Sequence, residues 1–221
     1  MKYLTFFAIL LLFIVLPNRV LAQGDPFKLS GEYSSNFGQF TIVVTNNKIT
    51  GLYEYYEQYD EKVKGYLREN IFFLKGTSVN GKDFSIISTD PGFPGDIQKG
   101  RLSFLNGKLK IVLTGTPPMD AGFDIDHESD KSYFPFVKPN KYLLLTFIKS
   151  KRAYLYNLNG DNFTIRKGYL VSNEFVKVVE KKDNFSKVLY QPVTDGKIYT
   201  YWVSNQDLLD PTADNWNGFV K

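Results

Sequence analysis

The acidic residues with the most regular spacing surround the only histidine, His127. They occupy alternate positions along the chain: Asp124, Asp126, Glu128 and Asp130. Oxygen ligands at alternate positions are what a calcium-binding loop uses, so the spacing gives a weak calcium hypothesis. The pattern then departs from such a loop, because Ser129 stands at the position of the turn glycine and Pro135 at that of the bidentate glutamate. The alternative is a solvated acidic loop whose charges need no partner, with no cofactor at all.

Composition excludes several kinds of catalytic site. The 221 residues include no cysteine and one histidine, which excludes thiol nucleophiles, cysteine-ligated metals and sites with two imidazole ligands. His127 is accompanied by no Gly-x-Ser-x-Gly motif and stands among acids, which favours an exposed titrating side chain over a general base. No carboxylate pair is singled out by its spacing as the acid and base of a hydrolase. The sequence therefore predicts a protein that is not an enzyme, and an enzyme of unrecognised type ranks last.

Four tyrosines lie close together in the first half of the chain: Tyr53, Tyr55, Tyr56 and Tyr59. On a strand, Tyr53 and Tyr55 share one face and Tyr56 takes the other. Both faces cannot be core, so some of these rings should be exposed, and Tyr53 and Tyr55 are the candidates for contact with a sugar or a protein partner. Tyrosines that merely cover the sheet are the alternative.

The first 22 residues have the features of a secretory signal peptide. Lys2 precedes an apolar run from Leu4 to Leu16, and Val20 and Ala22 fit a signal peptidase site. The run is shorter than the ~20 residues that span a bilayer, so we expect cleavage and no membrane insertion afterwards. An exported chain without cysteine is typical of the bacterial envelope, which predicts a periplasmic or secreted protein. Without Lys2 and Arg19 the chain is nearly neutral and has no basic block, so nucleic-acid binding is not expected.

Residues 24–149 predict an all-β domain, an antiparallel meander that closes as a barrel or sandwich. Turn dipeptides separate short alternating apolar runs: Asn46-Asn47, Asn80-Gly81 and Asn106-Gly107. Such dipeptides tolerate the positive φ angles of a tight hairpin, and a meander must close to bury its apolar face. The opening Ser30-Gly31-Glu32-Tyr33 and Gly38-Gln39-Phe40 loosely resembles the first strand of lipocalin-like barrels. We expect a long acidic loop from Thr116 to Asn140 and a final strand from Tyr142 to Ile148.

Residues 151–209 carry five short motifs in the order of a small β-barrel. They are Lys167-Gly168-Tyr169, Val176-Lys177-Val178, Phe185-Ser186-Lys187-Val188-Leu189-Tyr190, Trp202-Val203 and Asp207-Leu208. In this order they resemble a bacterial SH3-like (SH3b) domain. The chain departs from that family at Ser172-Asn173-Glu174, where Gly-Asp is usual, at Phe185, where Trp is usual, and at Tyr201, where Gly is usual.

The resemblance implies a second domain, a small SH3-like barrel, followed by a tail at 210–221. It implies recognition of cell-wall peptide or of a protein, or only packing against the first domain. Tyr154, Tyr156 and Tyr190 would line its shallow groove, and Trp202 would belong to the core or the same site.

We therefore expect an exported bacterial binding protein of two β modules, whose partner is peptidoglycan or an extracytoplasmic protein. The alternative is an inhibitor or immunity-type protein that blocks a wall-degrading enzyme. In that case the acidic 116–140 loop would meet a basic target.

Overall fold

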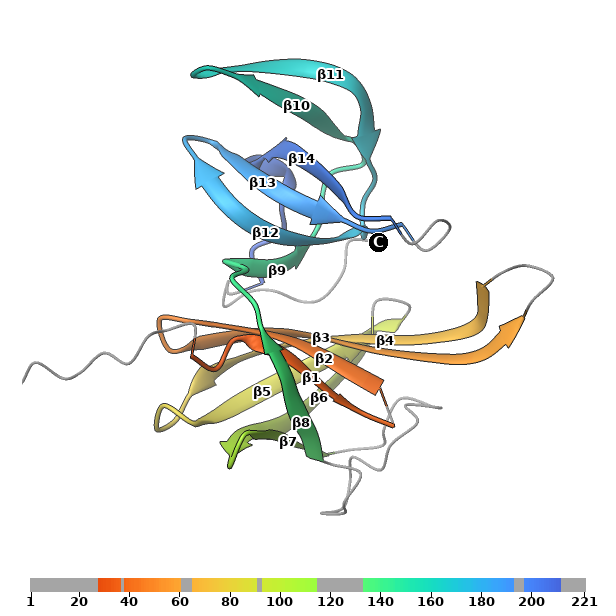
Figure 1. The fold of residues 1–221 in the computed structure, drawn as a ribbon, viewed down its shortest axis with the longest axis vertical. Coiled ribbons are helices and arrows are strands. Elements are labelled where there is room, and N and C mark those ends of the chain that lie inside the picture. Colours follow the sequence, from red (N-terminus) through yellow and green to blue (C-terminus); the bar gives the residue numbers. More distant parts are fainter. Residues whose placement is uncertain are drawn as a thin grey trace, which may run out of the picture.

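The computed structural model describes residues 28–36, 38–60, 65–90, 93–114, 133–192 and 197–211. These residues form fourteen β-strands and one short 3₁₀ turn, so the predicted all-β class is confirmed (Figure 1). Within the described ranges, no helix is long and apolar enough to cross a membrane.

Eight strands form a closed antiparallel barrel in which each strand pairs with the next and β8 pairs back with β1. They are β1 (Gly31–Ser35), β2 (Gly38–Thr45), β3 (Lys48–Asp60), β4 (Gly65–Ser78), β5 (Asp83–Asp90), β6 (Phe93–Leu105), β7 (Lys108–Thr114) and β8 (Tyr133–Pro139). Closure leaves no unpaired edge, which is how a meander of this size avoids edge-to-edge aggregation. The predicted meander barrel is confirmed.

The hairpins turn at the predicted dipeptides. Asn46 and Asn47 have φ angles of 49° and 62°, and Asn106 and Gly107 have 51° and 75°. Two successive positive φ angles match the right-handed twist of the strands that they join. Between β4 and β5, the Asn80 side-chain oxygen accepts a 2.9 Å hydrogen bond from the Asp83 backbone N–H, which holds that turn closed.

The acidic loop is shorter than predicted, because its last part is strand β8. The Phe134 side chain is fully buried in the barrel, and Asn140 donates a 3.1 Å hydrogen bond to the Ile42 carbonyl. Pro135 and Pro139 argued against a strand because proline cannot donate to a ladder. The structure includes both prolines in the pairing: Pro135 lies opposite Lys108 of β7, and Pro139, the last residue of β8, lies opposite Gly31 of β1.

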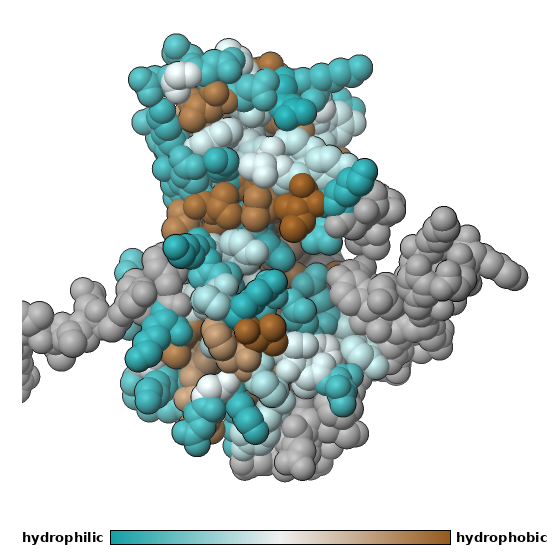
Figure 2. Space-filling view, in the orientation of Figure 1, coloured by the Kyte–Doolittle hydropathy of each residue, from teal (hydrophilic) through white to brown (hydrophobic). Residues whose placement is uncertain are grey.

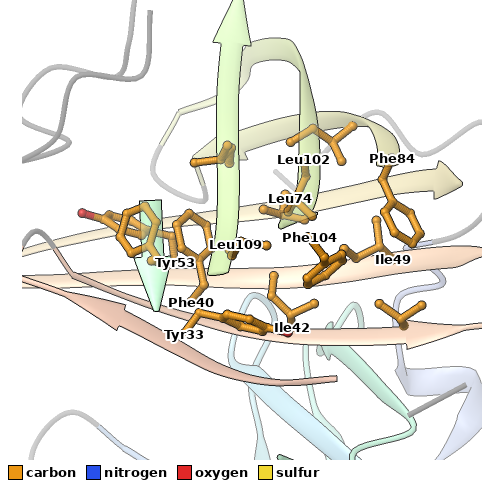
Figure 3. Close-up of a cluster of buried hydrophobic side chains, with 14 of the residues drawn as sticks. Tyr33, Phe40, Ile42, Ile49, Tyr53, Leu74, Phe84, Leu102, Phe104 and Leu109 are labelled. Carbon is orange, nitrogen blue, oxygen red and sulfur yellow. The ribbon is translucent and has the colours of Figure 1, made fainter. Parts of the chain in front are cut away.

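Aromatic and aliphatic side chains fill the barrel interior (Figure 3). Tyr53 belongs to this core, stacked on Phe72 with ring centroids 4.4 Å apart and tilted against Phe40 at 4.9 Å. Gly38 lies over the Tyr53 ring with φ of 123°, and a Cβ at this position would stand 2.7 Å from ring atoms. Glycine is therefore required where β2 begins.

Six strands form a second antiparallel sheet, in the order β11-β10-β14-β13-β12-β9. They are β9 (Leu144–Phe147), β10 (Ala153–Asn159), β11 (Asn162–Leu170), β12 (Phe175–Lys182), β13 (Phe185–Tyr190) and β14 (Tyr199–Ser204), with a 3₁₀ turn η2 (Asn205–Asp207) after β14. One face of this sheet carries its own apolar core, which includes Leu155, Val178, Val188 and Val203.

Strand β9 belongs to this second sheet, so the prediction that residues 142–148 complete the first domain is wrong. Leu145 pairs with Lys177 of β12. The strand is apolar on both sides: Leu145 and Phe147 pack on the outside of the barrel, whereas Leu144 and Ile148 pack against the core of the second sheet. A strand between two apolar layers shows no alternation that assigns it to either one.

The barrel and the second sheet meet in an apolar layer around β9, visible as a band of hydrophobic side chains between them (Figure 2). The outer faces of β2, β3 and β4 contribute Val43, Leu52 and Phe73. The Phe73 and Phe147 ring centroids are 5.2 Å apart, and the Leu145 N–H donates to the Thr50 hydroxyl. The two sheets therefore pack directly on each other.

Candidate ligand-binding face

Four aromatic rings form a cluster on the face of the second sheet that points away from its core. We call Tyr156, Phe163, Phe185 and Trp202 the ring cluster. Tyr156 lies opposite Trp202 across β10 and β14, and Trp202 lies opposite Lys187 of β13. Leu155 and Val203, their neighbours in sequence, point into the core, so strand alternation places the rings on the other face.

The rings of the cluster pack on one another. Phe163 and Phe185 are stacked with centroids 4.0 Å apart, and Tyr156 meets Phe185 edge-on at 4.7 Å. Trp202 meets Phe163 edge-on at 5.2 Å and is only 7% exposed. Lys187 Nζ lies 5.8 Å from the Trp202 ring centroid. The cluster is thus a preformed, rigid apolar platform.

An exposed apolar rim continues the cluster along β10 and β11. Tyr154 is 48% exposed, Ile165 66% and Tyr169 45%. Tyr154 pairs with Tyr169, and Ile165 pairs with Tyr156, so the rim adjoins the cluster. Between these pairs Leu155 faces the three residues Arg166 to Gly168, a bulge for which Gly168 takes a φ of 106°. The bulge presents Tyr169 beside Tyr154 at the edge of the sheet.

Basic side chains lie against two rings of this surface, and the second sheet has an excess of them. Residues 141–211 carry eleven Lys or Arg and seven Asp or Glu, whereas residues 28–140 carry thirteen and fourteen. The Arg152 guanidinium carbon lies 5.0 Å from the Tyr169 ring centroid. A 2.7 Å hydrogen bond between Lys182 and Asp161 lowers the pKa of the Asp161 carboxyl and raises the pKa of the Lys182 ammonium, which keeps both charged. The apolar platform therefore has two positive side chains against its rings, Arg152 at Tyr169 and Lys187 at Trp202.

The structure brings three of the predicted site residues together and separates the others. Tyr154, Tyr156 and Trp202 share the outer face. Tyr190 lies on the opposite face, where it packs on the core of the second sheet and donates a hydrogen bond to Glu174. Trp202 is buried, but in the ring cluster rather than in the sheet's core.

The two tyrosines predicted from the first domain have different environments. Tyr53 is fully buried inside the barrel, so its assignment to a partner-binding surface is corrected. It faces inward because Phe40, its partner on β2, faces inward as well. Tyr55 is half-buried and lines a hollow of about 280 Å³ with Ser34, Gln39 and Glu54.

Sequence reasoning missed Phe163, Ile165 and Tyr169 as surface residues and treated Phe185 as a substitute for a family tryptophan. Alternation supplied a usable signal: Tyr154 and Tyr156, and Phe163 and Ile165, are each two residues apart and share a face. The pairing of β10 with β11, which joins the two sets, is not encoded in the spacing.

The predicted calcium ligands, Asp124, Asp126, Glu128 and Asp130, lie outside the described residues, as does His127. The inhibitor alternative rests on the same loop and stays a prediction. In the part of the chain that the structure describes, no group of three or more His, Cys, Asp or Glu side chains is placed to hold a metal ion.

Comparison with known proteins finds no matching family model, no similar curated protein and no similar solved structure.

Proposed function

We propose that this chain is an exported bacterial binding protein without catalytic activity, whose second sheet is an SH3b-like module that recognises cell-wall peptide. The observation that carries the proposal is the ring cluster with its exposed rim. Tyr154, Ile165 and Tyr169 leave an apolar sheet face open beside packed rings. Rigid aromatic surface of this kind is enriched where proteins bind partners.

The positions of the five SH3b-like motifs support the same proposal. Lys167-Gly168-Tyr169 spans the end of the β11 bulge and the paired residue after it, and Val176-Lys177-Val178 lies in β12. The Phe185–Tyr190 motif is strand β13, and Trp202-Val203 lies in β14. Asp207 is the last residue of η2, and Leu208, which follows it, forms an isolated bridge with Ile148. All five motifs therefore fall on consecutive parts of one small β unit.

Charge supports peptide of the bacterial wall as the ligand. Stem peptides carry free carboxylates beside short apolar side chains. The excess of Lys and Arg over residues 141–211, with Arg152 next to Tyr169, complements those carboxylates. The rings would accept the apolar side chains.

Co-sedimentation of residues 23–221 with purified peptidoglycan tests the proposal. We expect the Tyr154→Ala/Tyr169→Ala double variant to bind at least tenfold more weakly, because both rings are exposed and central to the rim. Tyr133→Ala on β8 is the matched control and should bind like the wild type. Absence of wild-type binding, or equal weakening by both variants, would reject the aromatic face as a wall-binding surface.

A further inference from the structure

A groove of about 480 Å³ lies where the barrel meets the second sheet, away from the ring cluster. The barrel contributes the hairpin between β2 and β3, and the second sheet contributes β12, β13, η2 and the residues that follow it. Cavities of this volume hold small organic molecules.

The groove has a largely apolar floor. Val43 belongs to the apolar layer between the sheets, and Leu209 packs against that layer. Ile49 belongs to the barrel core and Leu208 to the core of the second sheet. Val43, Ile49 and Leu208 are themselves buried, so the accessible part of the floor comes from the half-buried Leu143, Leu144 and Leu209. Water covers these side chains unless a ligand displaces it.

Some polar groups of the lining have hydrogen-bond partners and one does not. The Thr50 hydroxyl accepts a hydrogen bond from the Leu145 N–H, and the Ser186 hydroxyl donates to Asn205, so these groups hold the walls together. The Thr45 hydroxyl is buried and has no hydrogen-bond partner among the residues that the structure describes. Buried hydroxyls without partners are uncommon because desolvation is then uncompensated.

Two lysines stand on opposite walls of the groove. Lys48 begins β3 in the barrel and Lys181 lies near the end of β12, and both are exposed. Asp210 is the single acid among the lining residues that the structure describes. The charge of the lining therefore favours an anion over a cation.

We propose that this groove binds a small amphiphilic anion, an alkyl chain that ends in a carboxylate or phosphate. The alkyl chain lies on the accessible part of the floor, against Leu144 and Leu209. The head group lies between Lys48 and Lys181 and accepts the hydrogen of the Thr45 hydroxyl. The ligand contacts both sheets, so its binding stabilises their packing. This site is independent of the aromatic face and of the proposed wall binding.

The test is calorimetric titration of residues 23–221 with decanoate and with decyl phosphate, below their micelle concentrations, and with decanol as the uncharged probe. We expect at least one of the two anions to bind at least tenfold more tightly than decanol, and the affinity to fall as salt is added. The comparison of decanoate with decyl phosphate identifies the preferred head group.

Variants at the groove test whether the anion binds at this site. Lys48→Gln/Lys181→Gln should weaken binding of the preferred anion at least tenfold, whereas Lys108→Gln on the exposed part of β7 should not. Thr45→Val preserves the side-chain size and should weaken binding without lowering the melting temperature of the free protein. Tyr154→Ala should bind the anion like the wild type, which separates this site from the proposed function. No anion binding, equal binding of decanol, or unchanged binding by the double lysine variant would overturn the proposal.

Discussion

Replacement of Tyr53 by alanine should lower the free energy of unfolding by about 3–5 kcal/mol, the usual cost of removing a large buried ring. The side chain has no exposed surface and contacts Phe40 and Phe72 inside the barrel. Its removal leaves a cavity that the closed barrel cannot collapse to fill, because neighbouring strands hold each other in register. Urea unfolding followed by far-UV circular dichroism measures the change.

Tyr154→Ala is the matched control for this prediction. Tyr154 is 48% exposed, so the same substitution there should change the free energy of unfolding by less than about 1 kcal/mol. We therefore expect the Tyr53 variant to lose stability of the barrel and the Tyr154 variant to lose ligand binding. Similar losses of stability in the two variants would contradict this assignment.

Replacement of Phe147 by alanine should also cost about 3–5 kcal/mol, because Phe147 joins the barrel to the second sheet. It is 2% exposed and contacts Phe73 of the barrel at 5.2 Å and Phe175 of the second sheet at 5.4 Å. Loss of this ring should weaken the packing of both sheets. Urea unfolding should show a lower midpoint, measured by circular dichroism and by NMR signals from each sheet.

Phe136→Ala serves as the control for the junction. Phe136 lies on β8 and is 40% exposed, so its removal should cost clearly less than that of Phe147. An equal cost for the two variants would show that the sheets do not depend on the apolar layer around β9.

Local turn chemistry made most of the barrel predictable. Asn46-Asn47 and Asn106-Gly107 adopt the positive φ angles that such dipeptides tolerate, and the flanking alternation defines the strands. Closure followed from the need to bury one apolar face. None of these steps depends on knowing that β8 pairs with β1 and closes the barrel.

The pairing of β8 in the barrel and the position of β9 between the two sheets were not predictable from the local alternation of apolar and polar residues. β8 closes the barrel and buries Phe134 in it, yet the neighbouring Pro135 favours a loop in the sequence. β9 is apolar on both faces because it lies between two cores, and its sequence fits either sheet equally well. Long-range pairing decides both cases, and it leaves no signal in a window of a few residues.

The candidate site was predicted in part for the same reason. Alternation places Tyr154 and Tyr156 on one face, but it does not say whether that face is inside or outside. Tyr53 and Tyr190 were predicted to lie on a binding surface, but Tyr53 faces the barrel core and Tyr190 faces the core of the second sheet. The exposed rim exists only because the β11 bulge brings Tyr169 beside Tyr154.

The most direct test of the central claim is an NMR titration of residues 23–221 with a soluble peptidoglycan fragment that carries its stem peptide. We expect shift changes for the Trp202 indole N–H and for the amides of β10, β11 and β13, with little change in the barrel. Shift changes confined to the barrel, or none at saturating fragment, would contradict the assignment of the aromatic face as the binding surface.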